Sequence, residues 1–159
     1  MATERFAFPD DERTPNNPIP ARVYRAALPA DANAQAQHFA GHGWTNSWQD
    51  GVHPYDHFHT TAHEVLGVAR GEATLTLGGE RGTSVTVRAG DVIVLPAGTG
   101  HKNDGSSEDF LVVGAYAHGL EWDTCRPGDL DLHEARARIQ AVPTPDLDPV
   151  SGLPWADTE

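Results

Sequence analysis

Short hydrophobic runs separated by glycines fill the middle of the chain. Residues Val65 to Ala69, Asp91 to Leu95 and Phe110 to Tyr116 are mostly apolar. Glu72 to Leu77 instead carries apolar side chains at every second position. Alternation with a period of two predicts a half-buried strand, whereas a continuous apolar run predicts a strand buried on both faces. These runs predict roughly seven or eight short strands in a small antiparallel β-barrel or sandwich.

The two ends of the chain add short helices to this all-β pattern. Asp31 predicts the N-cap of a helix that ends at Gly41. Asp131 predicts the N-cap of a second helix, which Pro143 closes because its ring cannot continue a helix.

The length of 159 residues is enough for a single core, so we expect one main domain with additions at both ends. Residues 1–43 should form an N-terminal arm, a strand and a short helix that pack on the barrel. Residues 44–125 should form the barrel itself. Residues 126–159 should form a C-terminal helix and a proline-rich strap, because prolines fix the backbone in an extended form.

Composition excludes several classes of partner. The net charge is −12 and the isoelectric point is near 5.0, so we expect no nucleic-acid partner. The single cysteine, Cys125, cannot form an internal disulfide, which fits a reducing compartment. No stretch approaches the roughly 20 apolar residues of a membrane span, and the N-terminus lacks the apolar core of a signal peptide. We therefore expect a cytoplasmic protein with no membrane partner.

Three histidines and one glutamate are the candidates for chemistry. His57 and His59 are separated by one residue, Glu64 follows, and His101 comes after a later turn. Residues two apart in a strand project from the same face, so His57 and His59 should point together. Imidazole is a common ligand of zinc, copper, iron and nickel. Such a set would hold one divalent metal ion and leave a position open for substrate, water or dioxygen.

The residues alone leave two alternatives for the fourth ligand. Along an unbroken strand His63 would share the face of His57 and His59, and Glu64 would point away. Glu64 can join the site only if the segment 60–62 contains a turn or bulge that reverses the alternation. Two threonines and an alanine do not compel such a bulge, so His63 and Glu64 remain competing candidates.

The spacing of these residues resembles the two motifs of the cupin superfamily. The first motif is matched without a gap. Five residues separate Gly51 from His57, one separates His57 from His59, four separate His59 from Glu64, and six separate Glu64 from Gly71. The later segment resembles the second motif, with five residues between Gly90 and Pro96, one between Pro96 and Gly98, and two between Gly98 and His101. The resemblance implies a small cupin-type β-barrel, a double-stranded β-helix or jelly roll. It also implies that one metal ion lies inside the barrel on His57, His59, Glu64 and His101, which favours Glu64 over His63.

The stretches HEVLGVARGEATLTLGGERG, PAGTGHKN and DFLVVGAY further resemble a group of single-domain bacterial cupins of the YjlB type. One position departs from the second motif, which usually has Asn four residues after its His. Here Asn103 comes two residues after His101, and position 105 is glycine. Because that Asn is not a ligand in the family, the departure affects the rim of the pocket rather than the metal.

The resemblance implies a metal-dependent enzyme, of oxygenase or isomerase type, acting on a small polar or anionic molecule. The alternative is a non-catalytic cupin that binds or senses a small molecule, with a structural or ligand-anchoring metal. The ion could be Zn, Ni, Fe, Mn or Cu, since His and Glu serve all of them. Cupins commonly pair, and both the arm and the strap could cross to a second chain, so we expect a homodimer.

Residues near the ligands in sequence supply the remaining candidates. Tyr55, His63 and Lys102 are candidates for proton transfer, on proximity in sequence only. Trp44 and Trp48, four residues apart, should either pack in the core or line a pocket.

Overall fold

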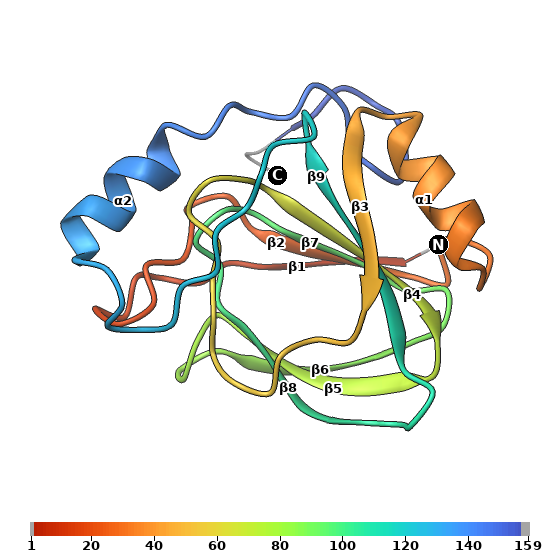
Figure 1. Ribbon diagram of the computed structural model, residues 1–159, viewed down its shortest axis with the longest axis horizontal. Coiled ribbons are helices and arrows are strands. Elements are labelled where there is room, and N and C mark those ends of the chain that lie inside the picture. The colour runs from red at the N-terminus through yellow and green to blue at the C-terminus, as the bar shows by residue number, and fades with distance from the viewer. Residues whose placement is uncertain (1, 157–159) are drawn as a thin grey trace.

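Two antiparallel β-sheets face each other in the computed structural model, which describes residues 2–156 (Figure 1). The larger sheet has the order β1 (Ala2–Phe6), β2 (Ala21–Arg25), β7 (Val92–Leu95), β4 (Glu64–Arg70), β9 (Leu111–Ala117) and β3 (Trp44–Asp50). The smaller sheet has the order β6 (Thr83–Arg88), β5 (Glu72–Leu77) and β8 (His101–Ser106). The predicted all-β, jelly-roll class is confirmed, although the sheets remain two layers and do not close into a continuous barrel.

Both predicted helices are present with the expected caps. Helix α1 (Ala32–Ala40) begins after Asp31, whose side chain accepts a hydrogen bond from the Ala34 N–H. Helix α2 (Leu132–Gln140) begins after Asp131 in the same way. Within residues 2–156, neither helix has the length and apolar character needed to cross a membrane.

The sequence pattern missed three strands, and all three lie at sheet edges. β1 and β3 are the outer strands of the larger sheet, and β8 is an outer strand of the smaller one. Edge strands face water along one side, so they carry charged and polar residues and lack an apolar run. The sequences TNSWQ in β3 and HKNDGS in β8 show this composition.

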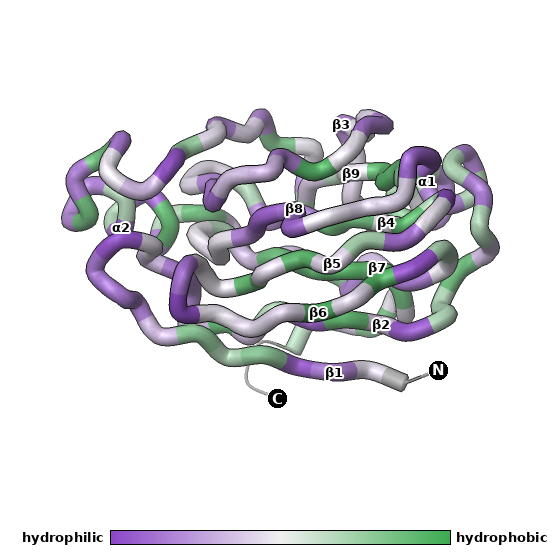
Figure 2. The backbone as a smooth tube through the Cα atoms, turned by 90° about the horizontal axis from the view of Figure 1, so that it is seen from below, coloured by the Kyte–Doolittle hydropathy of each residue, from purple (hydrophilic) through white to green (hydrophobic). Residues whose placement is uncertain are grey.

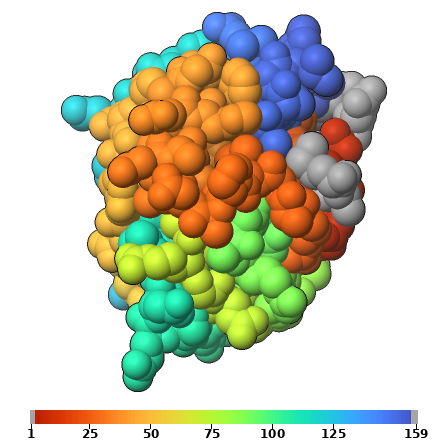
Figure 3. Space-filling model, turned by 90° about the vertical axis from the view of Figure 1, so that its right-hand side faces the viewer, coloured from red at the N-terminus to blue at the C-terminus, as the bar shows by residue number. Residues whose placement is uncertain are grey.

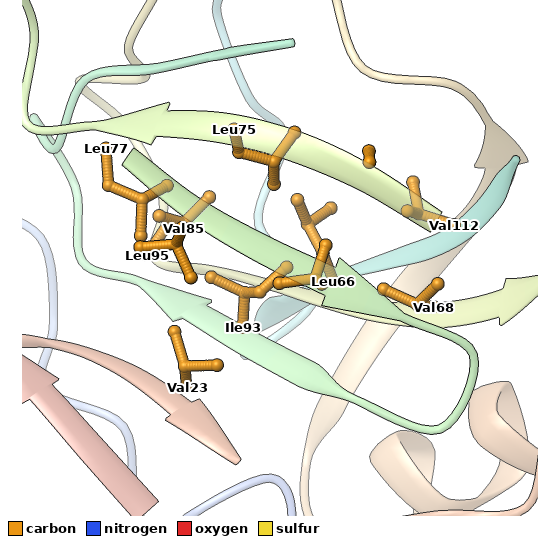
Figure 4. Close-up of a cluster of buried hydrophobic side chains, with 11 residues drawn as sticks. Val23, Leu66, Val68, Leu75, Leu77, Val85, Ile93, Leu95 and Val112 are labelled. Atoms are coloured by element: carbon orange, nitrogen blue, oxygen red, sulfur yellow. The ribbon is translucent and has the colours of Figure 1, made fainter. Parts of the chain in front are cut away.

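The main core fills the space between the two sheets. Its side chains come from alternate positions of the strands, so that Leu66 and Ile93 point inward while Val65 and Val92 point outward. Figure 4 shows the inward side chains of β5, β4 and β7 meeting one another. Figure 2 shows the matching hydrophobic stretches along β2, β4 and β7. The apolar run at 91–95 is thus buried on both faces, as its composition predicts.

A second apolar layer covers the outer face of the larger sheet. Helix α1 lies over β4 and β9 through Phe39, which is fully buried. The chain after α2 crosses the same face, and Figure 3 shows this segment, in blue, beside the orange surface of α1 and β3. Trp44 packs here, in the core, where its indole N–H donates to the Leu147 carbonyl at 2.9 Å.

The predicted C-terminal strap is held to its own chain by a buried ion pair. Arg22 of β2 lies 2.9 Å from Asp148, and the hydroxyl of Tyr24 donates to the same carboxylate. The Arg22 guanidinium also lies 3.8 Å from the centre of the Trp155 ring. The strap therefore lies along the body as far as residue 156, and residues 157–159 of the prediction lie outside the described residues. The homodimer stays a prediction.

Candidate metal centre

Three histidines meet at one end of the space between the sheets. His57 and His59 lie on the segment between β3 and β4, and His101 is the first residue of β8. One ring nitrogen of each lies within 4.8 Å of the others. The backbones of His57 and His101 exchange two hydrogen bonds, of 3.2 and 3.0 Å, which bring the two segments into register. All three side chains are buried.

Glu64 joins these histidines because the chain changes direction between His59 and β4. Thr60 and Thr61 form a bend, after which Glu64 begins β4 on the inward face shared with Leu66. The Glu64 Oε1 atom lies 3.4 Å from Nε2 of His59 and 3.4 Å from Nε2 of His101. The reversal of alternation that Glu64 requires is therefore present.

Asp123 holds this bend in place from a distant part of the chain. Its carboxylate accepts the N–H of Thr60 at 2.6 Å and the hydroxyl of the same residue. Its backbone carbonyl accepts a hydrogen bond from Nδ1 of His59. Next to it, the backbones of Phe58 and Cys125 exchange two hydrogen bonds of 2.9 Å. No spacing rule in the sequence links Asp123 to the histidines, so this residue was not predicted.

The three rings are oriented by backbone carbonyl groups. Each histidine places its Nδ1 atom against a carbonyl oxygen: Tyr55 for His57 at 2.9 Å, Asp123 for His59, and Thr99 for His101 at 3.0 Å. Because a carbonyl oxygen only accepts, each Nδ1 must carry the proton and donate it. The Nε2 atom of each ring is then the nitrogen free to bind a cation, which is the usual arrangement of metal-binding histidines.

The ionisation of the site reflects burial and mutual charge. Burial lowers the pKa of His57 to about 2, helped by the adjacent His101, so the ring is neutral near pH 7. Burial opposes ionisation of Glu64, yet the neighbouring His59 and His101 hold its pKa below the ordinary value. Burial also acts against the charge of His59, but the Glu64 carboxylate raises the pKa of that ring. A proton on His59 and a divalent cation thus compete for the same nitrogen and the same carboxylate.

These donors fit a divalent metal ion. Glu64 is fully buried, yet its Oε1 has no hydrogen-bond donor among the described residues. Two ligands on one ion, each at about 2.1 Å, lie roughly 3.0 to 3.4 Å apart, and the two Nε2–Oε1 distances of 3.4 Å match this separation. Three imidazole nitrogens and one carboxylate oxygen suit Zn, Ni, Fe, Mn or Cu.

A hydrogen-bonded chain orients the carboxylate of Glu64. The indole N–H of Trp48 donates to the hydroxyl of Tyr116 at 2.8 Å, and this hydroxyl donates to Glu64 Oε2 at 2.7 Å. Gly114 makes room for the indole, since a Cβ there would lie 2.3 Å from the Trp48 ring. Of the two tryptophans Trp44 and Trp48, Trp48 is the one that lines the pocket. Tyr116 was not predicted, although it lies four residues after Val112 in the predicted strand and so points to the same inward face.

A cavity of about 250 Å³ opens beside these residues. Its lining includes the four candidate ligands His57, His59, Glu64 and His101, the aromatic residues Trp48, Tyr116 and Trp122, and the mouth residues Asp50, His53 and Thr124. A ligand bound there would contact both the candidate metal position and an aromatic wall.

The three residues predicted for proton transfer are not among the described residues that line this cavity. Tyr55 packs between His53 and the guanidinium of Arg126, which lies 4.1 Å from its ring centre. Lys102 lies 3.5 Å from Asp104 with its side chain partly exposed. His63 faces a different cavity, next to the arm and α2, and its Nδ1 accepts the Ala97 N–H at 2.8 Å.

Comparison with known proteins agrees with this fold. Residues 47–113 match the family model described as a cupin domain. The uncharacterized protein YjlB of Bacillus subtilis (strain 168) is 42% identical over 151 residues, covering 94% of this chain and 91% of that protein. The chain therefore belongs to the cupin superfamily, among its YjlB-like members.

Solved structures show more distant likenesses. Acireductone dioxygenase from Bacillus anthracis, with a cadmium ion in its active centre, is 20% identical over 57% of this chain and 60% of its own, with a TM-score of 0.39. Oxalate decarboxylase from Bacillus subtilis, which has Mn(II) centres, is 18% identical over 67% of this chain and 27% of its own, also with a TM-score of 0.39. The chain thus spans less than two thirds of either protein, and these values do not bear on its activity.

Replacing Tyr116 by Phe should weaken metal binding by about 10- to 100-fold, because Glu64 loses the donor that orients it. Competition with a chromophoric chelator for Zn²⁺ would measure the change. Tyr55→Phe is the matched control, since its ring lies outside the cavity, and it should leave the affinity unchanged. Equal affinities of Tyr116→Phe and the wild type would contradict this positioning role.

His63 should make the metal-free protein less stable in mild acid. Burial, with a smaller contribution from His118, lowers the pKa of His63 to about 4, from 6.5. The unfolded chain then binds a proton before the folded one. The contribution of neutral His63 to the free energy of unfolding is therefore fully present above about pH 6.5. It is lost as the pH drops toward 4, and amounts to about 3 kcal/mol in total. Urea unfolding of His63→Gln should show a shallower pH dependence than the wild type or exposed His133→Gln. If the free energy of unfolding of His63→Gln and of the wild type changed equally with pH, His63 would not be the source of the pH dependence.

Proposed function

We propose that the chain is a metal-dependent enzyme, of oxygenase or isomerase type, that acts on a small polar molecule. His57, His59, Glu64 and His101 would hold one divalent metal ion. The observation that carries this proposal is the common orientation of the three rings, each donating Nδ1–H to a carbonyl around a buried carboxylate oxygen that has no donor. A bound cation would give that oxygen a partner, because an unpaired buried acceptor is unfavourable.

When bound, the ion would act as a Lewis acid on a substrate oxygen or, if it is redox-active, support dioxygen chemistry. The residues of the chain supply position and exclusion of water. Tyr116 and Trp48 fix the carboxylate so that Oε2 is occupied by a hydrogen bond and Oε1 points toward the histidines. Four protein ligands would leave one or two positions on such an ion for a bound molecule.

The cavity beside the ligands supports a ligand-binding role over a purely structural metal. A structural site is closed on all sides, whereas this one borders about 250 Å³ of space with polar groups in its wall. Asp50 and His53 are the titratable groups at the mouth, and they replace Tyr55, His63 and Lys102 as the proposed proton-transfer groups.

A non-catalytic binding or sensing module is the second candidate. The observation in its favour is that Asp50 and His53 are both exposed, and the hydroxyl beside the ligands, Tyr116, is committed to Glu64. Such a protein would bind a small molecule without turning it over.

Protein purified without chelator should contain about one metal ion per chain by elemental analysis. Glu64→Gln and His101→Ala should lose it, because each removes a ligand. His63→Ala should retain it, as should His133→Ala on the exposed face of α2. Circular dichroism would verify that each variant is folded. If His63→Ala lost the metal and Glu64→Gln kept it, the ligand set would be wrong.

A screen of small polar compounds, in air and under nitrogen, would separate the reaction types. An oxygenase should consume dioxygen with a substrate and stop under nitrogen, while an isomerase should continue. Both activities should disappear when the metal is removed and return when it is added back. A compound that binds the metal-loaded protein and is never converted would instead support the sensing module.

A further inference from the structure

A second cavity, the His63 cavity, lies between the N-terminal arm, His63 and the C-terminal end of helix α2. It shares no lining residue with the cavity at the metal centre. Its volume of about 580 Å³ lies within the range of roughly 300 to 1,000 Å³ that small-molecule pockets usually have. The proposed function assigns no role to this cavity.

The wall of the His63 cavity carries no acidic side chain, lysine or arginine among the described residues. Its apolar lining consists of Pro18, Ile19, Pro20, Ile139 and Val142. Its polar lining residues are Asn17, His63, Gln140 and Thr144. Gln140 and Val142 lie at the C-terminal end of α2, where the partial negative charge of the helix carbonyls opposes an anion. The cavity therefore favours a largely apolar molecule without a negative charge.

Tight packing and hydrogen bonds fix the walls of this cavity. A Cβ atom on Gly98 would lie 2.6 Å from the Asn16 carbonyl oxygen and 2.6 Å from Cδ1 of Ile139. The arm, the turn after β7 and helix α2 thus meet closely at this point. The side-chain amide of Asn17 also donates to the Ala97 carbonyl at 2.8 Å, which ties the arm to the same turn. The cavity is therefore formed before a ligand arrives.

His63 contributes one hydrogen-bond donor that no described residue accepts. Its Nδ1 accepts the Ala97 N–H at 2.8 Å, so the proton of the neutral ring is on Nε2. Only 4% of His63 is exposed, and Nε2 borders the cavity rather than packed protein. A second proton, on Nδ1, would face the Ala97 N–H, so the backbone keeps this ring a neutral donor. A ligand oxygen would supply the acceptor that this buried donor lacks.

We propose that the His63 cavity is a second small-molecule site, for an uncharged and largely apolar molecule that places a carbonyl oxygen on the Nε2–H of His63. A carbonyl suits the neutral donor, whereas a carboxylate would lose its hydration without gaining a cation. Arg136, in the adjoining pocket, is already paired with Asp10. This site lies beyond the proposed function and does not depend on the metal.

Acetophenone and benzoate are matched probes of this site. They are similar in size, with about nine non-hydrogen atoms each, and differ in a neutral carbonyl against a carboxylate. NMR titration of the ¹⁵N-labelled protein would measure each affinity and locate each probe. Acetophenone should shift the amide signals of Gly98, Gln140 and Val142, with a Kd in the millimolar range expected for so small a ligand. Benzoate should bind at least about 10-fold more weakly.

His63→Asn tests the donor separately from the cavity. The asparagine side-chain oxygen can replace Nδ1 as acceptor of the Ala97 N–H, but nothing replaces the Nε2–H. Acetophenone should bind this variant about 5-fold more weakly than the wild type, because one neutral hydrogen bond is lost. His133→Asn, the same change at an exposed position of α2, should leave the affinity unchanged. Val142→Trp should abolish binding, because the indole would occupy the cavity.

Circular dichroism would verify that each variant is folded, and Val142→Trp with the two probes decides the matter if His63→Asn is not. Equal affinity of acetophenone for the wild type and folded His63→Asn, or tighter binding of benzoate, would overturn the inference. So would the absence of shifts, or shifts confined to the metal-site cavity, at Gly51 and Thr124. Signals of the His63 cavity that respond to protein concentration and not to the probe would place a second copy of the chain there, and would also overturn it. None of these results tests the metal ligands, so the proposed function is judged separately.

Discussion

The hydrogen bonds that Asp123 makes to the segment after His59 are the constraint on which the site depends. A regular strand from His57 onward would carry Glu64 to the outer face of the sheet, which packs under helix α1. The bend at Thr60 needs partners for backbone groups that leave the sheet, and the Asp123 carboxylate supplies one of them. The same residue orients His59 through its carbonyl. A single loop residue therefore sets both the direction of the chain and the position of a ring.

Burial of the Glu64 carboxylate is the second consequence of this arrangement. Such a group requires a partner for each oxygen, since the interior does not replace the hydration it loses. Tyr116 provides for Oε2, and Oε1 is directed at the two Nε2 atoms. Tyr116 is in turn fixed by Trp48 on the edge strand β3. Side chains from β3, β4 and β9 of the larger sheet and from β8 of the smaller sheet thus meet around the Glu64 carboxylate, beside the cavity.

The outer face of the larger sheet is covered by helix α1 and the C-terminal strap. There the C-terminal strap closes over the apolar side chains of β2, β7 and β9 together with α1, anchored by the buried pair of Arg22 and Asp148. Without that cover, a strand such as β7 would expose Val92 and Val94 to water. The strap accounts for the continuous apolar runs of the sequence, while the site occupies the opposite, inner face of the same sheet.

The sequence by itself determined the strands with a clear apolar pattern, both helix caps, and the motif spacing that names His57, His59, Glu64 and His101. These features are local, or are set by the period of a strand, so they can be read without coordinates. The tertiary structure decided the rest. The bend that turns Glu64 toward the histidines, and the roles of Tyr116, Trp48 and Asp123, depend on contacts between segments 52 to 68 residues apart. The local sequence pattern does not predict such contacts, because only packing of the two sheets brings those side chains within hydrogen-bond distance.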